Sequence, residues 1–185
     1  LDMPLQQYSD PVLQRMRRQI TAAETSELLQ KIREIHPEIK LRTTFLVGFP
    51  GETQEDHKAL CRFVKQAKFD RVGVFEYSHE EGTRGYVLED DVPAEVKKQR
   101  AEEIMAIQQS ISLAHNEAMI GKTLKVLIDR KEGGQYVGRS EYDSPEVDNE
   151  IWIDQTDKKL TPGSFVMVLI TGASDYDLKG IPITK

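Results

Sequence analysis

The chain has 185 residues, of which 38% are hydrophobic and 30% charged, with a formal net charge of −6. This composition predicts a soluble globular protein of one or two domains that can bury a core. There is no apolar run of membrane length and no signal peptide, so we expect a cytoplasmic protein. Because Cys61 is the single cysteine, it excludes an internal disulfide and an iron–sulfur cluster held by this chain alone.

The first part of the chain alternates helical and strand patterns. Residues 1–6 look like the end of a strand, and helices are predicted to begin at Asp10-Pro11 and at a capping box of Thr21 and Glu24. A strand at 39–47, a helix at 53–68 and a strand at 71–77 follow. This order predicts a parallel sheet. A sheet of about three strands with one unpaired edge is incomplete, so we expect the chain to be a fragment.

The second part is different in character. A loop at 78–92 precedes a helix from 93 to about 119, which is long enough to act as a strut between domains. Short strands then follow at 123–128, 135–138, 150–153 and 164–170, separated by turn residues, which predicts a small closed or nearly closed β-barrel. We therefore predict two domains, at residues 1–119 and 120–185.

The turn Gly48-Phe49-Pro50-Gly51 carries the strongest functional signal. Gly48 and Gly51 allow the backbone to approach a bound group closely, and Pro50 stiffens the turn. Turns of this kind at the carboxyl ends of parallel strands are where α/β folds bind small molecules. A purely structural turn between strand and helix is an equally good interpretation of the motif in isolation.

No metal ligand is expected from the histidines. His36, His57, His79 and His115 have no metal-ligand spacing among themselves. Cys61 lies in an apolar helical pattern and is predicted to be a buried thiol rather than a nucleophile.

Several motifs in order resemble one family. Residues 5–18, 43–53 and 69–83 resemble the second half of the barrel of radical SAM methylthiotransferases. Residues 136–140 and 143–148 look like the TRAM domain of the member that methylthiolates an aspartate of small-subunit ribosomal protein S-twelve. The resemblance implies an α/β fold, the second half of a radical SAM (β/α)6 partial TIM barrel with parallel strands, followed by a small all-β, OB-like TRAM barrel.

The resemblance also implies cofactors and their contacts. The parent enzyme is expected to bind S-adenosylmethionine and two [4Fe-4S] clusters, whose cysteines belong to an N-terminal part of the parent, so this chain is expected to hold no cluster and no catalytic residue. Gln6 would face the ribose, and Arg18 would pair with the methionyl carboxylate. Leu46 and the backbone around Gly48 would border the adenine, and Gly51 is also expected to bind the cofactor. Without the resemblance, Arg18 could equally be a solvated charge at a helix end and Gln6 a surface residue.

The charge of the C-terminal tail, residues 120–185, indicates which kind of partner the protein binds. From residue 120 onward it has nine basic and eleven acidic residues, a net charge of −2, so direct binding of nucleic acid is not expected. Its acidic segment, with Asp143, Glu146 and Asp148, suits a basic partner such as the ribosomal protein, and a solvated acidic loop without a partner is the alternative. A tRNA methylthiotransferase and a non-catalytic binding adaptor remain alternatives, and no membrane partner is expected.

Overall fold

The computed structural model describes residues 1–145, 147–154 and 159–183. The chain forms two compact units, Leu1–Ile111 and Ser112–Lys185, which divide within the long helix α4 (Ala94–Glu117). The domain boundary expected at 119/120 falls inside the second unit. No helix in the described ranges is both long enough and apolar enough to cross a membrane.

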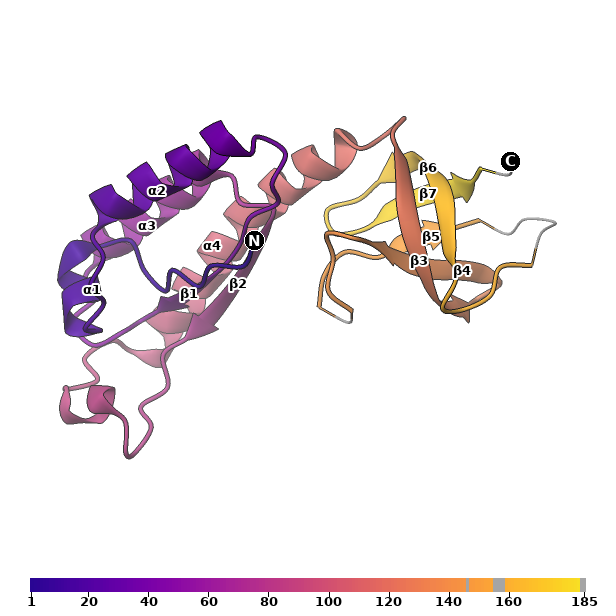
Figure 1. The fold of residues 1–185 in the computed structure, drawn as a ribbon. Coiled ribbons are helices and arrows are strands. Elements are labelled where there is room, and N and C mark those ends of the chain that lie inside the picture. The colour runs from indigo at the N-terminus through magenta and orange to yellow at the C-terminus, as the bar shows by residue number, and fades with distance from the viewer. Residues whose placement is uncertain (146, 155–158, 184–185) are drawn as a thin grey trace. The chain divides into compact units, whose positions relative to one another are not determined.

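The first unit is an α/β layer built on parallel strands (Figure 1). Strand β1 (Arg42–Val47) pairs in parallel with β2 (Arg71–Glu76), from Arg42 opposite Arg71 to Val47 opposite Glu76. The predicted parallel sheet is confirmed. The opposite edge of β1 is occupied by the first residues of the chain, through parallel bridges at Asp2 and Gln6.

Local sequence signals fix where the helices begin. Helices α2 (Ala22–Ile35) and α3 (Gln54–Ala67) each start with a complete capping box, Thr21 with Glu24 and Thr53 with Asp56. The short α1 (Asp10–Arg15) starts at a proline suited to the first helical turn. The loop at 78–92 contains a 3-10 turn, η1 (Arg84–Val87), which the sequence did not predict.

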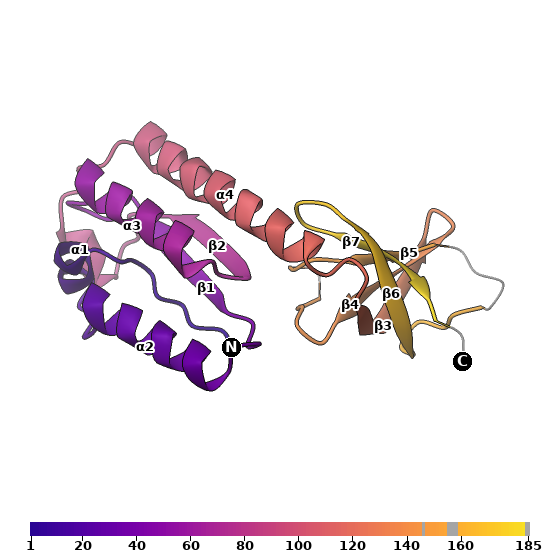
Figure 2. The same cartoon turned by 90° about the horizontal axis from the view of Figure 1, so that it is seen from above.

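One face of the sheet carries the core. Alternate residues of β1, including Phe45 and Val47, are fully buried against α2, α3 and α4, which lie side by side over the strands (Figure 2). Phe63 and Phe69 meet Phe45 edge to face, with ring centroids 6.3 and 5.9 Å away. The other face is open: Phe75 of β2 is 62% exposed there, beside its register partner Leu46.

The second unit is a closed five-stranded barrel in the order β3-β4-β5-β7-β6. The predicted small β-barrel is confirmed. Its strands are β3 (Thr123–Glu132), β4 (Gln135–Ser140), β5 (Ile151–Ile153), β6 (Phe165–Ala173) and β7 (Leu178–Pro182), and only β5 and β7 pair in parallel. Strand β7 was not predicted, because Gly180 and Pro182 are poor strand formers, and it exists through its pairing with β5 and β6.

Candidate functional site

A cavity of about 610 Å³ opens where β1 ends in the first unit. Its wall comes from the edge segment at Gln6, the end of β1, the end of α1 and the η1 turn. It combines polar and apolar side chains, and none of its lining residues is acidic: Gln6, Gln14, Arg15, Met16, Arg17, Arg18, Leu46, Phe49, Arg84, Gly85, Val87 and Leu88. The volume lies within the range of small-molecule and cofactor sites.

Two residues of this wall have strained backbones. Gln6 has φ of +71° and Arg17 has φ of +58°, and only one other described non-glycine residue, Lys68, has a positive φ. A left-handed conformation costs a residue with a side chain roughly 1–2 kcal/mol. Strain of this kind concentrates at functional sites, so its presence at two points of one cavity marks the cavity as the candidate site.

The strained turn at Arg17 places Arg17 and Arg18 on the cavity wall. α1 ends at Arg15 with Met16 as its C-cap, and the N–H of Arg18 then folds back to donate to the carbonyl of Leu13 at 2.9 Å. This closure sets Arg17 and Arg18 on the cavity wall directly after the helix. A helix of six residues is too short to matter for its dipole, so the charge of the site comes from the guanidinium groups.

The cavity is therefore strongly cationic. Nη1 of Arg15 donates to the carbonyl of Gly51 at 2.8 Å. Arg17, Arg18 and Arg84 have no carboxylate partner among the described residues. Several cations around one hollow, without a compensating acid, raise the local concentration of anions, and a planar guanidinium can hold a carboxylate through two parallel hydrogen bonds. The arrangement suits a ligand with a carboxylate and an apolar part.

The structure brings three of the predicted cofactor residues together. Gln6, Arg18 and Leu46 all line the cavity, although they come from three different segments. Gln14 and Arg84 also line it and were missed. Gln14 is an exposed position in a short helix and Arg84 lies in a loop without periodicity, so no sequence pattern marked either of them.

Gly48 and Gly51 do not line the cavity. A Cβ on Gly48 would lie 2.2 Å from Cγ of Lys97, and the Gly48 N–H donates to the Glu52 carboxylate. The N–H of Gly51 donates to Asp91 Oδ1 at 2.7 Å, while its carbonyl holds Arg15. The two glycines thus shape the turn and position Arg15, and their contact with a cofactor stays a prediction.

A buried ionic network anchors the turn to α4. Glu52 is 4% exposed, and Nη1 of Arg100 lies 3.5 Å from its Oε1 and donates to its backbone carbonyl at 3.0 Å. Burial raises the pKa of Glu52, and the Arg100 charge opposes that rise. Nearby, Nζ of Lys97 contacts both carboxylate oxygens of Asp90 at 2.7 Å and the carbonyl of Tyr77 at 3.3 Å.

The acidic segment of the second unit is structured by its own carboxylates. Ser140 Oγ donates to Asp143 at 2.6 Å, and the N–H of Ser144 donates to Asp148 at 2.7 Å. Glu146 lies outside the described residues. A role of these three residues in substrate binding stays a prediction.

The chain is similar to known proteins along nearly its whole length. A family model described as a TRAM domain matches residues 120–183. The protein named ribosomal protein uS12 methylthiotransferase RimO from Christiangramia forsetii is 51% identical over 183 residues, which cover 99% of this chain and 41% of that protein. Its namesake from Porphyromonas gingivalis is 54% identical over 182 residues, covering 96% of this chain and 42% of that protein.

A solved structure of coproporphyrinogen III oxidase from Escherichia coli, described as a radical SAM enzyme, resembles 71% of this chain and 28% of its own, with 20% identity and a TM-score of 0.47. A likeness of that size supports no conclusion. The sequence relatives are much more similar, because about half of all residues are identical along nearly the entire chain. The chain therefore resembles part of the proteins named uS12 methylthiotransferases along nearly its whole length, contains a TRAM domain, and spans about two fifths of the length of the relatives it matches.

Proposed function

We propose that this chain supplies one side of the S-adenosylmethionine pocket, together with the TRAM domain, of a radical SAM methylthiotransferase that modifies an aspartate of ribosomal protein uS12. The observation that carries the proposal is the arginine-rich cavity with two strained wall residues, in a chain whose relatives are named for that activity. Bound S-adenosylmethionine would supply the radical for the reaction, and the residues of this chain would bind and orient it.

The cavity wall fits the parts of this cofactor. Arg18 would hold the methionyl carboxylate, and the side-chain amide of Gln6 can donate to and accept from ribose hydroxyls. Leu46 and Phe49 offer an apolar wall for the adenine. Because the sulfonium is cationic, the surrounding arginines would direct it away from the end of α1.

The iron–sulfur clusters of this enzyme class do not fit this chain alone. A cluster takes several thiolates, and the chain has only Cys61, which is half-buried and whose pKa is raised by burial. We propose that a cluster-bearing part of the enzyme covers the open face of the sheet at Leu46 and Phe75. Parallel sheets are normally covered on both faces, and a 62% exposed phenylalanine on that face supports a missing cover.

The proposed cofactor contact is tested by removing one arginine. Arg18→Ala in the active enzyme should weaken S-adenosylmethionine binding by about ten- to hundredfold, because a lost hydrogen bond to a charged group costs on the order of 1.5–3 kcal/mol. Arg62→Ala is the matched control, since Arg62 is an exposed arginine of α3 that does not line the cavity. Calorimetric titration measures both affinities. Equal affinities for the two variants would remove Arg18 from the pocket.

The enzymatic proposal is tested with a chimera. The matching segment of the Porphyromonas gingivalis relative, which is 54% identical, is replaced by this chain. We expect the chimera to methylthiolate uS12, as read by mass spectrometry of the modified peptide, and to leave tRNA unmodified. Modification of tRNA would favour the alternative methylthiotransferase, and a folded chimera that binds S-adenosylmethionine but modifies neither would favour a binding role only.

The acidic segment supports a role in target recognition. Its carboxylates lie in a tail of net charge −2, and we propose that they attract the basic ribosomal protein. Attraction of this kind acts mainly on the association rate and weakens with salt, since the Debye length is about 8 Å at physiological ionic strength.

A further inference from the structure

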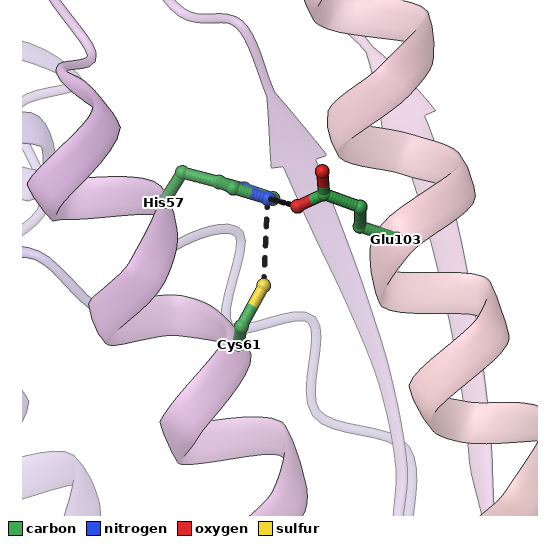
Figure 3. A group of neighbouring side chains, drawn as sticks. All are labelled: His57, Cys61 and Glu103. Carbon is green, nitrogen blue, oxygen red and sulfur yellow. Dashed lines mark hydrogen bonds and ion pairs between the residues drawn. The ribbon is translucent and has the colours of Figure 1, made fainter.

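A group of three potential metal ligands lies on the helix layer of the first unit, on the side of the sheet away from the proposed cofactor contacts of Leu46. His57 and Cys61 are one helical turn apart on α3, and Glu103 reaches them from α4. Figure 3 shows the three side chains converging between the two helices. In the described part of the chain, no other three such side chains place their ligand atoms within 4.8 Å of one another.

The distances are close to those of a metal site. Nε2 of His57 lies 2.7 Å from Oε2 of Glu103 and 3.4 Å from Sγ of Cys61. Tetrahedral zinc with ordinary bond lengths holds such atoms about 3.4–3.6 Å apart. The histidine and cysteine already have this separation. Only the glutamate has to move, and it can, because its side chain is 42% exposed on a flexible stem.

Two buried polar atoms at His57 and Glu52 lack hydrogen-bond partners among the described residues. The ring is 1% exposed, and its Nδ1 has no hydrogen-bond partner among the described residues. Nδ1 lies 4.0 Å from Oε1 of Glu52, a buried oxygen that also lacks a hydrogen bond. A neutral imidazole has only one N–H. If Nε2 carries it, the bare Nδ1 faces an oxygen of Glu52; if Nδ1 carries it, the bare Nε2 faces an oxygen of Glu103.

A cation at Nε2 removes this conflict. The N–H then sits on Nδ1, 4.0 Å from Oε1 of Glu52, while the lone pair of Nε2 and the groups of Cys61 and Glu103 would bind the metal. A ligating histidine whose other nitrogen donates to a carboxylate is the usual arrangement around protein-bound zinc. We propose that His57, Cys61 and Glu103 form a binding site for a zinc-like divalent cation, with Glu52 orienting the histidine.

The ligand set selects the kind of metal. Thiolate, imidazole and carboxylate are the ligands of zinc, whereas calcium and magnesium take oxygen ligands. Three protein ligands leave a fourth position, and the half-buried Cys61 and partly exposed Glu103 leave it accessible to water. The metal would join α3 to α4 directly behind the Glu52–Arg100 pair that anchors the turn.

The histidine spacing gave no warning of this site, because only one histidine takes part. The pattern that marks it is His57 followed by Cys61 four residues later on one helix. Glu103 lies 42 residues after Cys61, on another helix, and could not be assigned as a partner without the fold.

Cobalt(II) tests the proposal on the 185-residue chain, freed of metal and kept reduced and anaerobic. We expect one cobalt per chain, with a thiolate-to-cobalt charge-transfer band and the intense visible bands of tetrahedral coordination. Added zinc should displace the cobalt and raise the melting temperature of the helical signal.

Two mild substitutions identify the ligands. Cys61→Ser should abolish the charge-transfer band, and Glu103→Gln should weaken cobalt binding by at least about tenfold, since even the loss of an outer-shell partner commonly costs that much. Glu102→Gln is the matched control: Glu102 is the neighbouring exposed residue, and it pairs with Lys98 on the same helix. Circular dichroism verifies that all three variants fold.

Three outcomes would overturn the proposal. Cobalt binding without the sulfur band means an adventitious ion on surface carboxylates. Equal affinities of Glu103→Gln and Glu102→Gln remove Glu103 as a ligand. No binding at all by the folded chain means that His57 is held by its hydrogen bond to Glu103 and not by a metal. None of these results bears on Arg18 or the cofactor cavity, so this inference and the proposed function fail separately.

Discussion

Removing the buried cation of Arg100 should destabilise the first unit severely. Arg100 is 6% exposed and its partner Glu52 is 4% exposed, so Arg100→Met strands a carboxylate in a site with little water. Breaking a buried ion pair by deleting one partner costs about 3–5 kcal/mol. That is a large part of the roughly 5–15 kcal/mol that stabilise a typical domain.

A second substitution, at Glu52, tests whether the loss of stability comes from the unpaired charge or from the changed side-chain shape. Glu52→Gln keeps an acceptor for the Gly48 N–H but removes the stranded charge. The double variant Glu52→Gln, Arg100→Met should therefore be more stable than Arg100→Met alone. Arg62→Met on the exposed face of α3 should change the free energy of unfolding by at most about 0.5 kcal/mol.

Lower pH should rescue Arg100→Met in part. Burial and the neighbouring Asp56 raise the pKa of Glu52 above its ordinary 4.5, and Arg100 and the Gly48 and Phe49 N–H groups oppose the rise. Without Arg100, this pKa rises further. Between 4.5 and the raised value the folded chain binds more protons than the unfolded one, so stability increases as pH falls through that window.

Urea denaturation followed by two signals provides the measurement. The far-ultraviolet helix signal reports mainly on the first unit, and the fluorescence of Trp152, the single tryptophan, reports on the barrel. Only the helix transition should shift, because every described contact of Arg100 lies in the first unit. A loss below about 1 kcal/mol, or a loss that does not shrink from pH 7 to pH 5, would refute the reasoning about an uncompensated buried charge.

Three further substitutions test other parts of the structure. Gly48→Ala should cost the first unit at least about 1–2 kcal/mol for its φ of +74°, because the new Cβ must also displace a buried lysine, and denaturation by the helix signal measures it. Gly180→Ala should destabilise the barrel by about 1–3 kcal/mol, read by tryptophan fluorescence, since its Cβ would lie 2.4 Å from a core valine. Lysine at Asp143, Glu146 and Asp148 should slow association of the full enzyme with uS12 and flatten its salt dependence in stopped-flow measurements, while asparagine at the same positions controls for the loop hydrogen bonds. Unchanged rates would leave the acidic segment without a role in recognition.

Local signals explain how much of the fold could be predicted. The capping boxes at Thr21 and Thr53 place two helices within a residue of their observed starts, because each box satisfies its own backbone donors without help from the rest of the chain. Strand β7 could not be predicted in this way. Gly180 has a low strand propensity, but a side chain there would meet the backbone of β6. Close packing in the barrel therefore requires glycine at this position.

The residues of the candidate site also fall into those that motifs predicted and those that depend on tertiary packing. Gln6, Arg18 and Leu46 were predicted together through a resemblance that covers whole motifs, and they share one cavity. Arg84 was missed, because loop residues take their position from tertiary packing and follow no periodicity. His57 and Glu103 were missed as partners for a related reason: they come together only when α3 packs beside α4.

The turn at Gly48 links the two sites proposed here. On one side, the carbonyl of Gly51 holds Arg15 on the cavity wall. On the other, the N–H of Gly48 donates to Glu52, whose Oε1 lies 4.0 Å from Nδ1 of His57. If a change in the metal site moved Glu52, the turn would therefore move first, and the cavity would be affected only through the turn. Because Arg18 is held by the end of α1 and not by this turn, its contact with a carboxylate should survive such a change, whereas the position of Arg15 should not.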